Sequence, residues 1–303
     1  MNLPPERPGL LAEALRTGRF AVTAEVAPPR SADVTRLRET ARLLRGWVDA
    51  ANVTDNQGAR VRMSSLAASV VLLAEGLAPV MQMTCRDRNR IALQSDLLAV
   101  GALGIPNVLL MTGDRPEHGD HPDAVPVYDL DSDTLMAAAR ALRDDATLLS
   151  GQTVDPPPRY LIGAVDAGAG EPERLARKIA SGAEFVQTQF VFDVPAFATW
   201  LDRVRDLGLT ERCGILAGVG PIRSLRALEV MTALPGVTVP AAVQRRLRGV
   251  PTLRVAEEGM SVCAEIVATL RELPGLAGVH IMSVAYERGV PEILTAAGLG
   301  RAA

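Results

Sequence analysis

Aromatic residues, histidine and cysteine are all scarce in this chain. Phenylalanine, tryptophan and tyrosine make up 3% of the 303 residues, whereas hydrophobic residues make up 48%, so the core must be aliphatic. The sequence has three histidines and three cysteines. A zinc hydrolase needs several such ligands, so this scarcity disfavours one. The histidines also do not supply a Ser-His-Asp set.

Blocks of like charge, long apolar runs and paired cysteines are absent too. The net charge of −3 carries no basic block, which argues against nucleic-acid binding. No apolar run approaches the roughly 20 residues of a membrane-spanning helix, and the first residues do not resemble a signal peptide. Cys85, Cys213 and Cys263 have no CxxC or zinc spacing, so we expect free thiols and a cytoplasmic protein.

Short aliphatic runs alternate with longer helical patterns. Strands apolar on both faces and separated by helices indicate a parallel sheet covered by helices. Eight such units predict one (β/α)8 TIM barrel, which takes about 250 residues plus extensions. An open doubly wound sheet is the alternative, although no GxGxxG follows the first run. The predicted strands are 20–26, 49–54, 79–84, 107–112, 160–165, 184–190, 213–218 and 278–284, and the predicted helices are 33–47, 61–76, 88–103, 132–143, 172–182, 195–206, 222–233 and 254–272.

Two polar or Pro/Gly-rich stretches interrupt this alternation and read as insertions rather than domain boundaries. The second of them is expected to contain a short helix at 241–248, and Asp133 is expected to cap the helix that follows the first. The predicted organisation is a single barrel domain over 1–303, with an N-terminal extension at 1–19 and loop insertions at 113–131 and 234–253.

One carboxylate, Glu25, lies near the end of the otherwise apolar first run, just before Pro28 and Pro29. Proline cannot donate to a sheet, so the run ends there. Burying an unpaired carboxylate is costly, so this group is either paired or used. Two interpretations stay open: an ordinary satisfied carboxylate at a strand end, or a proton donor at the mouth of the barrel.

The remaining strand ends carry amides, hydroxyls and carboxylates. In such barrels the functional residues lie at the carboxyl ends of the strands. Amide side chains both donate and accept in fixed geometry, which suits recognition of a flat heterocycle. Gln187 and Gln189 are two residues apart and therefore expected on one face of their strand. The strand ends carry, among others, Thr54, Asp55, Asn56, Gln57, Gln82, Thr84, Thr112, Asp114, Asp166, Gln187, Gln189 and Ser283.

Three further features have competing interpretations. His118 and His121 could hold a metal, but the surrounding Pro and Gly favour a solvent loop, and we expect no metal site. The arginines 86, 88 and 90 could bind a phosphate bidentately or form a solvated helix start. Cys85 reads as a small buried residue.

Five short motifs occur in an order that resembles the methylenetetrahydrofolate reductase family, over about residues 20–300. They are Ala-Glu-Val-Ala-Pro-Pro-Arg (24–30), Val-Thr-Asp-Asn-Gln (53–57), Met-Thr-Cys-Arg-Asp-Arg-Asn (83–89), Gly-Ile-Pro-Asn-Val-Leu-Leu-Met-Thr-Gly-Asp (104–114) and Gln-Thr-Gln-Phe-Val-Phe-Asp (187–193). The resemblance implies a (β/α)8 barrel that usually carries FAD. It also implies hydride transfer from NAD(P)H through the flavin to 5,10-methylenetetrahydrofolate, giving 5-methyltetrahydrofolate for one-carbon metabolism and methionine biosynthesis.

The resemblance also implies roles for particular residues. Glu25 matches the family's general acid, which protonates N10 so that the five-membered ring opens to an iminium. Asp114 matches the aspartate that hydrogen-bonds the pterin near the flavin, and Gln189 matches a glutamine that contacts the pterin. Leu225 falls near a folate-stacking aromatic, and Gln187 is expected beside the substrate. The positions that match flavin contacts are Thr54, Gln82, Thr84, Thr112, Asp166 and Lys178.

The chain departs from the FAD enzymes at the flavin positions. Gln82, Thr112 and Val165 stand where those enzymes have His, Arg and Tyr. Other branches of the family use FMN, need a partner subunit, or dispense with flavin. Three functions therefore stay open: a flavin-dependent reductase, a reductase in which NAD(P)H delivers hydride directly, and a C1-pterin-binding subunit that needs a partner for electron or methyl transfer. The choice between NADH and NADPH and the oligomeric state stay open as well.

Overall fold

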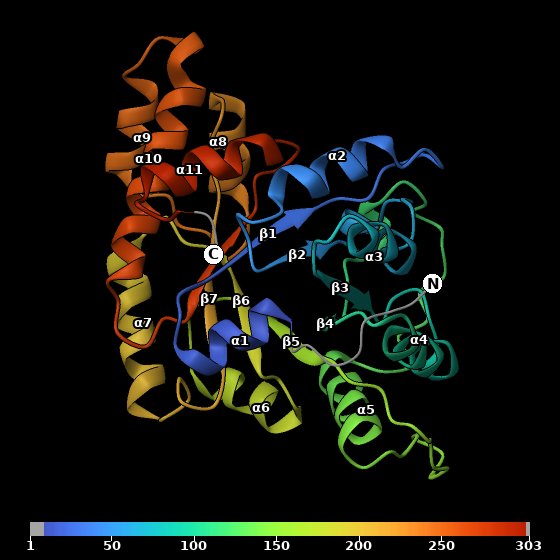
Figure 1. Ribbon diagram of the computed structural model, residues 1–303. Coiled ribbons are helices and arrows are strands. Elements are labelled where there is room, and N and C mark those ends of the chain that lie inside the picture. Colours follow the sequence, from blue (N-terminus) through green and yellow to red (C-terminus); the bar gives the residue numbers. More distant parts are fainter. Residues whose placement is uncertain (1–8, 301–303) are drawn as a thin grey trace.

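A computed structural model describes residues 9–300 of the chain. Within these residues, eight parallel strands pair in chain order and close into a barrel, with β8 hydrogen-bonded to β1 (Figure 1). The predicted (β/α)8 barrel is therefore confirmed. The strands are β1 (Ala21–Val26), β2 (Ala50–Val53), β3 (Pro79–Thr84), β4 (Asn107–Met111), β5 (Leu161–Asp166), β6 (Phe185–Phe190), β7 (Gly214–Val219) and β8 (Gly278–Ile281).

Helices cover the outer face of the sheet. Each predicted helix is present, and its first and last residues lie within a few positions of the predicted ones. They are α2 (Thr35–Leu44), α3 (Ser65–Ala74), α4 (Arg90–Leu103), α5 (Ser132–Asp144), α6 (Glu173–Ser181), α7 (Val194–Asp206), α8 (Leu225–Ala233) and α10 (Val255–Arg271). Two helices were not predicted: α1 (Leu10–Thr17), inside the stretch expected only as an extension, and α11 (Val290–Ala296) after the last strand.

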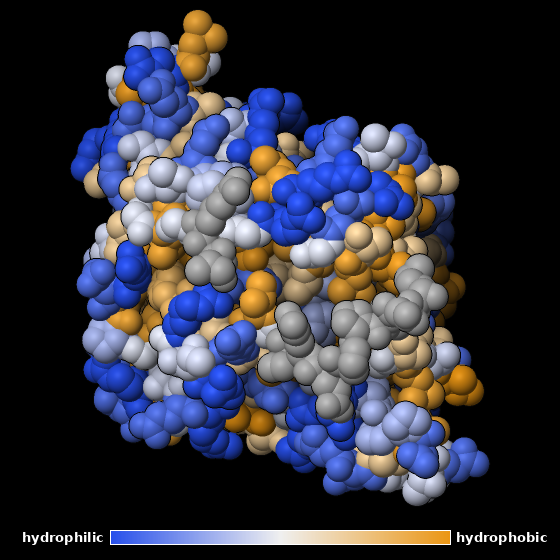
Figure 2. Space-filling view, in the orientation of Figure 1, coloured by the Kyte–Doolittle hydropathy of each residue, from blue (hydrophilic) through white to orange (hydrophobic). Residues whose placement is uncertain are grey.

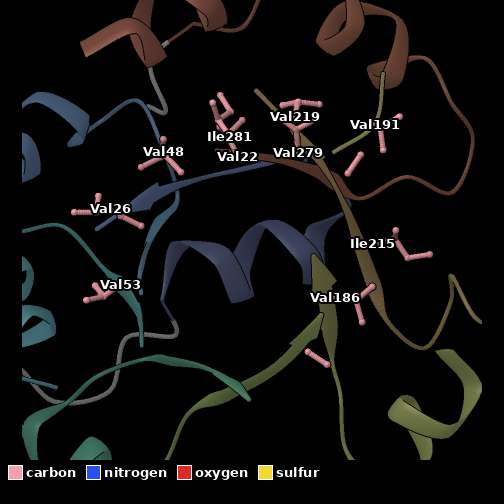
Figure 3. Packing of buried hydrophobic residues seen from close by; sticks show 14 of the residues in the cluster. Val22, Val26, Val48, Val53, Val186, Val191, Ile215, Val219, Val279 and Ile281 are labelled. Carbon is pink, nitrogen blue, oxygen red and sulfur yellow. The ribbon is translucent and has the colours of Figure 1, made fainter. Parts of the chain in front are cut away.

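The main core lies between the sheet and this layer of helices. Branched aliphatic side chains on alternate strand positions point outward into it, and Figure 3 shows Val26, Val53, Ile215 and Ile281 among them. Such residues fill the pleated outer surface of a parallel barrel well. Hydrophilic residues cover much of the molecular surface in the view of Figure 2.

The inside of the barrel is apolar at its amino-terminal end. There α1 closes the barrel, and Leu11 and Ala14 pack with inward residues from the amino-terminal halves of six strands. Phe185 fills the centre, where Gly163 must lack a side chain because a Cβ atom would lie 2.2 Å from the Phe185 ring. The inward strand residues of this cluster are Ala21, Ala50, Val80, Leu109, Phe185 and Leu216.

The two predicted insertions have different structures. Residues 113–131 form an extended loop with one 3-10 turn, η2 (Pro116–His118), whereas the second contains α9 (Ala241–Arg248) where the short helix was expected. The prediction that Asp133 caps α5 is wrong. Asp131 is the N-cap, because its carboxylate accepts the Thr134 N–H at 2.7 Å while the Thr134 hydroxyl lies 3.0 Å from the Asp131 nitrogen.

No helix formed by residues 9–300 has the length and apolar character needed to cross a membrane. The described residues likewise contain no group of three or more His, Cys, Asp or Glu side chains that could hold a metal ion. All three cysteines are free and buried, and burial raises the pKa of the Cys85 thiol to about 11.

Candidate functional site at the mouth of the barrel

Glu25 lies at the carboxyl end of β1, one residue before that strand ends. Its side chain is half-buried, and its Oε1 atom accepts one hydrogen bond, from Gln57 Nε2 at 3.2 Å. Burial raises the pKa of this carboxyl to about 7, the amide of Gln57 opposes that shift, and the negative charge of Glu287 adds to it. Glu25 is thus poised to hold and release a proton near neutral pH.

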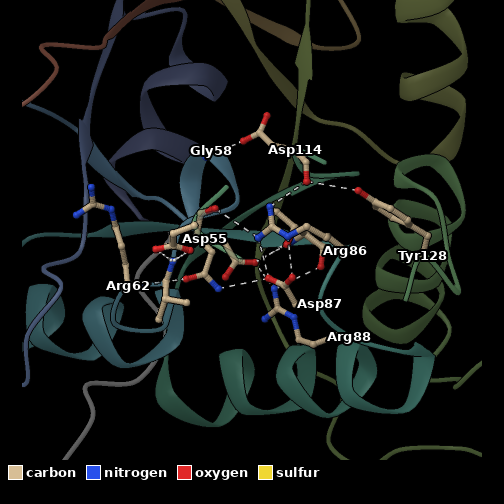
Figure 4. A network of polar contacts seen from close by, with 12 residues as sticks. Asp55, Gly58, Arg62, Arg86, Asp87, Arg88, Asp114 and Tyr128 are labelled. Atoms are coloured by element: carbon tan, nitrogen blue, oxygen red, sulfur yellow. Dashed lines mark hydrogen bonds and ion pairs between the residues drawn. The ribbon is translucent and has the colours of Figure 1, made fainter. Parts of the chain in front are cut away.

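The loop after β2 connects Glu25 to Asp114. Gln57 and Gly58 are consecutive residues in the short 3-10 turn η1 (Gln57–Ala59). The first donates to Glu25, and the backbone N–H of the second donates to Asp114 Oδ2 at 2.8 Å (Figure 4). The Asp114 side chain is exposed, so one of its carboxylate oxygens remains open to a ligand. The two residues expected to act on substrate therefore lie on opposite sides of one turn.

Asp55 and Arg86 form hydrogen bonds and ion pairs beside this turn. The Asp55 carboxylate accepts the Thr84 N–H at 2.8 Å and the Thr84 hydroxyl at 3.0 Å, and it pairs with Arg88. Arg86 is buried and donates to the Asp114 carbonyl oxygen at 3.2 Å, while the Tyr128 hydroxyl donates to the same oxygen at 3.4 Å (Figure 4). These bonds fix the backbone of Asp114 and leave its side chain at the surface.

The arginines at 86, 88 and 90 are all engaged with carboxylates. Their partners are Asp87 for Arg86, Asp55 and Asp96 for Arg88, and Asp129 for Arg90. They stabilise the start of α4 and the loops around it. A phosphate would have to displace these carboxylates, so the ion pairs favour the structural interpretation of this cluster.

The two glutamines of β6 lie in different surroundings. Gln187 is buried inside the barrel, where its amide exchanges hydrogen bonds with Asn52 and donates to the Thr23 hydroxyl at 3.1 Å. Gln187 was expected to contact substrate, but its amide oxygen and nitrogen already form hydrogen bonds with neighbouring side chains. Gln189 lies at the strand end and is half-buried. Its Oε1 accepts the Phe190 N–H at 3.0 Å, which leaves its amide nitrogen for a ligand.

A neutral histidine completes the layer around Gln187. The His280 Nδ1 atom lies 2.9 Å from the Thr23 hydroxyl, and burial lowers the pKa of His280 to about 3. The Thr23 hydroxyl therefore joins Gln187 and His280 in one buried set of uncharged polar side chains. This uncharged polar layer separates the apolar end of the barrel from its mouth.

The six expected flavin positions do not all lie on one surface, although Thr54, Gln82 and Thr84 occupy inward positions in or just after the neighbouring strands β2 and β3. Thr54 and Gln82 are buried, with the Thr54 hydroxyl lacking a hydrogen-bond partner among residues 9–300, while Thr112 is exposed. The Thr84 hydroxyl is taken by Asp55. Asp166 and Lys178 are buried, and Asp166 follows the outward-facing Ile162 and Ala164 at alternate positions of β5, toward the helices. Asp166 and Lys178 therefore do not share a surface with Thr54, Gln82 and Thr84, and a flavin dinucleotide bound at all six positions does not fit.

The loop after β8 forms the other rim of the mouth. Its 3-10 turn η4 (Glu287–Gly289) packs against β1 and α2 and brings Glu287 toward Glu25. The guanidinium carbon of Arg223 lies 3.6 Å from the centroid of the Tyr286 ring. Leu225 follows Arg223 by two residues, begins α8 and is half-buried.

The sequence placed Gln57 at the end of the second strand without a role, and it did not point to Glu287 at all. Gln57 belongs to the Val-Thr-Asp-Asn-Gln motif, which was a signal for it, but nothing in the sequence shows which strand end its side chain would reach. The metal interpretation of His118 and His121 is not supported, because Asp120 between them instead pairs with Arg30 and accepts the Val61 N–H.

The closed eight-stranded parallel barrel with helices on its outer face places the chain in the class of (β/α)8 barrel proteins. Comparison with known proteins gives the particular family. The family profile of methylenetetrahydrofolate reductase matches residues 10–298, and the chain belongs to that family.

Individual relatives are distant. The chain is 26% identical over 234 residues to the probable methylenetetrahydrofolate reductase (NADH) of Oryza sativa subsp. japonica, covering 73% of this chain but 38% of that protein. It is 27% identical over 228 residues to the 5,10-methylenetetrahydrofolate reductase of Pectobacterium carotovorum subsp. carotovorum, covering 74% of this chain and 71% of that protein. The chain thus spans well under half the length of the plant relative and most of the bacterial one.

Among solved structures, an uncharacterized protein from Clostridium thermocellum superposes with a TM-score of 0.62 at 16% identity, covering 94% of this chain and 97% of that one. That protein is described as binding two copies of 5-methyl-5,6,7,8-tetrahydrofolic acid. At this level of identity the similarity shows a shared fold.

Proposed function

We propose that this protein is a 5,10-methylenetetrahydrofolate reductase that uses NAD(P)H as the hydride donor. The observation that carries the proposal is Glu25, a carboxyl with a pKa near 7 at the mouth of the barrel, linked by one turn to the exposed Asp114. Membership of the reductase family and the folate bound by the Clostridium thermocellum protein support a folate as substrate. The relatives named for NADH and NADPH support a nicotinamide nucleotide.

In the proposed reaction, Glu25 gives its proton to N10 of the bound folate. The bond between N10 and the bridging methylene carbon then breaks, which leaves an iminium between that carbon and N5. A hydride from the reduced nicotinamide adds to the carbon and produces the methyl group, while the nucleotide is oxidised. Glu25 regains its proton from water. An acid serves best when its pKa lies near the working pH, as the pKa of Glu25 does.

Asp114 and Gln189 are proposed to hold the pterin ring. The free carboxylate oxygen of Asp114 can accept hydrogen bonds from ring N–H groups, and the amide nitrogen of Gln189 can donate to a ring oxygen or nitrogen. Leu225 would offer an apolar contact to the aromatic ring of the folate. Gln187 acts indirectly in this scheme, because its amide is bonded inside the barrel.

Flavin is proposed to bind weakly or not at all. Of the expected flavin positions, Asp166 and Lys178 lie toward the helices and not at the mouth with Thr54, Gln82 and Thr84. Dialysed protein should show no flavin absorbance and should still oxidise NAD(P)H when methylenetetrahydrofolate is added. A stoichiometric flavin that survives prolonged dialysis would contradict this part of the proposal.

The test of the function is product formation by the purified chain. Methylenetetrahydrofolate and NADH or NADPH are supplied together, and 5-methyltetrahydrofolate is measured by mass spectrometry. We expect product in proportion to the nicotinamide oxidised. If the isolated chain binds folate but oxidises neither nucleotide, the activity requires a partner subunit, and the reductase proposal for this chain alone is wrong.

A further inference from the structure

The turn that connects Glu25 and Asp114 has an unusual backbone. Asn56, Gly58 and Ala59 all have left-handed conformations, with φ of 49°, 66° and 52°. Glycine adopts this region freely, but Asn56 and especially Ala59 do not. Residues of this kind persist in such a conformation only where their surroundings impose it. Contacts with both ends of the turn impose this conformation.

Asn56 fixes the beginning of the turn through its side-chain amide. Its side-chain oxygen accepts the Arg62 N–H at 3.0 Å, and its side-chain nitrogen donates to Asp87 at 3.3 Å. Asp87 in turn pairs with Arg86, which donates to the Asp114 carbonyl oxygen. The beginning of the turn is thus tied to the same arginine that fixes the backbone of Asp114.

The insertion at 113–131 holds the other end of the turn. The Asp120 N–H donates to the Ala59 carbonyl oxygen at 3.4 Å, and the Asp120 carboxylate accepts the Val61 N–H at 3.2 Å. Gly119 allows this approach, because a Cβ atom at that position would lie 2.0 Å from the Ala59 carbonyl oxygen. The polar insertion, for which the sequence suggested no role beyond a solvent loop, lies directly on the turn.

Between these two anchors, Gln57 is directed at Glu25. Its amide nitrogen lies 3.2 Å from Glu25 Oε1, and no second hydrogen bond to the Glu25 side chain is present among residues 9–300. We propose that Gln57 is a positioning residue, which orients the Glu25 carboxyl for proton transfer and is itself fixed by the insertion through Gly119 and Asp120. This inference rests on the proposed reductase function.

The hydrogen bond from Gln57 decides which oxygen carries the proton. Oε1 accepts from the amide and therefore acts as the carbonyl oxygen of the protonated carboxyl, so the acidic proton lies on Oε2. An amide is neutral, so it fixes the carboxyl without adding a cation that would hold it ionised. Without this donor, the carboxyl could rotate and exchange the two oxygens.

The charged groups around this corner come from several elements. Glu287 and Arg288 are on η4, which packs against β1, and the Arg62 guanidinium after β2 donates to the Pro28 carbonyl oxygen at 3.3 Å. Asp114 lies across the turn. Among these, Glu287 is the group whose charge acts on Glu25, and it raises the Glu25 pKa, whereas the bond from Gln57 lowers it.

These opposing effects allow a graded test on the full-length protein. Gln57 is exposed, so it can be replaced without opening the core. Gln57→Met keeps the length but cannot donate, and Gln57→Lys donates and adds a positive charge. Gln152, an exposed glutamine in the loop before β5, provides the matched controls Gln152→Met and Gln152→Lys. Thermal unfolding of all four variants verifies the fold.

The first readout is the titration of Glu25 itself, followed by carbon-13 NMR of labelled protein and assigned with Glu25→Gln. We expect the Glu25 pKa to rise in Gln57→Met, to fall in Gln57→Lys, and to stay at the parent value in both Gln152 variants. The same pKa in parent, Met and Lys forms would overturn the inference. This readout needs no turnover.

The second readout is the rate of methyltetrahydrofolate formation against pH. In Gln57→Met the maximal rate below the pKa should drop about 10- to 100-fold, as misplacement of a catalytic group does, while the fall at high pH moves upward. An unchanged maximal rate would overturn the positioning role. If the parent makes no methyltetrahydrofolate, the proposed function fails. The order of the Glu25 pKa values measured by NMR in the parent, Gln57→Met and Gln57→Lys forms still decides whether Gln57 holds the carboxyl.

Discussion

The two ends of the barrel each contain a carboxylate, and the hydrogen-bond donors around these two groups differ. Asp49, just before β2 at the amino-terminal end, has a side chain that is 1% exposed, and it is bonded to Arg19 at 2.5 Å and to the Val22 N–H at 2.8 Å. Glu25, at the mouth, has one neutral donor at 3.2 Å and a second carboxylate nearby. A carboxylate that accepts hydrogen bonds from an arginine and a backbone N–H supports the fold. One left with a single amide holds a proton near neutral pH and can transfer it.

The largest effect should come from removing the acid. Glu25→Gln keeps the size and the hydrogen-bonding capacity of the side chain but has no acidic proton. General acid catalysis is typically worth about 10²- to 10⁴-fold, so methyltetrahydrofolate formation should fall by about that factor. Folate binding, measured by calorimetry, should change little. A variant that reduces methylenetetrahydrofolate at close to the parent rate would make Glu25 a structural carboxylate, and Asp114 and Asp55 would be the next candidates for the acid.

The next effect concerns recognition of the pterin. Asp114→Ala and Gln189→Ala should each weaken folate binding, because each removes a proposed hydrogen bond to the ring. Losing a bond to a charged group costs about 1.5–3 kcal/mol, which corresponds to about one to two decades in affinity. Fluorescence or calorimetric titration measures this directly, with Gln152→Ala as the control. Unchanged affinity in both variants would contradict the assignment of these two residues.

Stability sharpens the comparison between the two carboxylates. Asp49→Asn should lower the free energy of unfolding by about 1–3 kcal/mol, because Arg19 and the Val22 N–H lose their charged acceptor. Glu25→Gln should not be destabilising at about pH 8. A carboxyl whose pKa is raised in the folded state loses stability as the pH rises from its unfolded pKa through its folded pKa, and the glutamine avoids this loss. Urea unfolding at two pH values measures both effects. Equal destabilisation by the two substitutions would remove the distinction.

The smallest effect should come from Glu287. Its charge raises the Glu25 pKa, so Glu287→Gln should lower that pKa and move the high-pH fall in rate toward lower pH. The maximal rate at low pH should stay near the parent value, because the acid and its orientation are intact. Glu292→Gln, in the first turn of α11, is the control, because Glu292 is not among the groups that shift the Glu25 pKa. A shift toward higher pH would mean that Glu287 does not act on Glu25 through its charge.

The fold followed from the sequence because alternating apolar runs and helical patterns repeat eight times, several of them with capping residues at the helix starts. Asp193 and Ser224, for example, cap α7 and α8 with side chains that accept backbone N–H groups three residues on. The helix α1 was missed because eight residues beside a proline-rich start carry little signal, and its two buried residues acquire a role only once the barrel end exists to receive them.

The site was less accessible from the sequence. Strand ends could be read as candidates, but two strand-end glutamines at the same spacing, Gln187 and Gln189, differ in burial because they occupy different depths in the barrel. Contacts such as the one from Gln57 to Glu25 depend on a left-handed turn that is imposed by a loop about 60 residues further along the chain. No local pattern encodes such a contact.

The central claim is that Glu25 is the proton donor, and the pH dependence of single-turnover methyltetrahydrofolate formation tests it most directly. For the parent protein, the account predicts a constant rate at low pH and a tenfold fall per pH unit above a pKa of about 7. For Glu25→Gln it predicts a rate lower by about 10²-fold or more, with that fall absent. A Glu25→Gln profile that keeps the same fall near pH 7 would show that another group supplies the proton and would contradict the account.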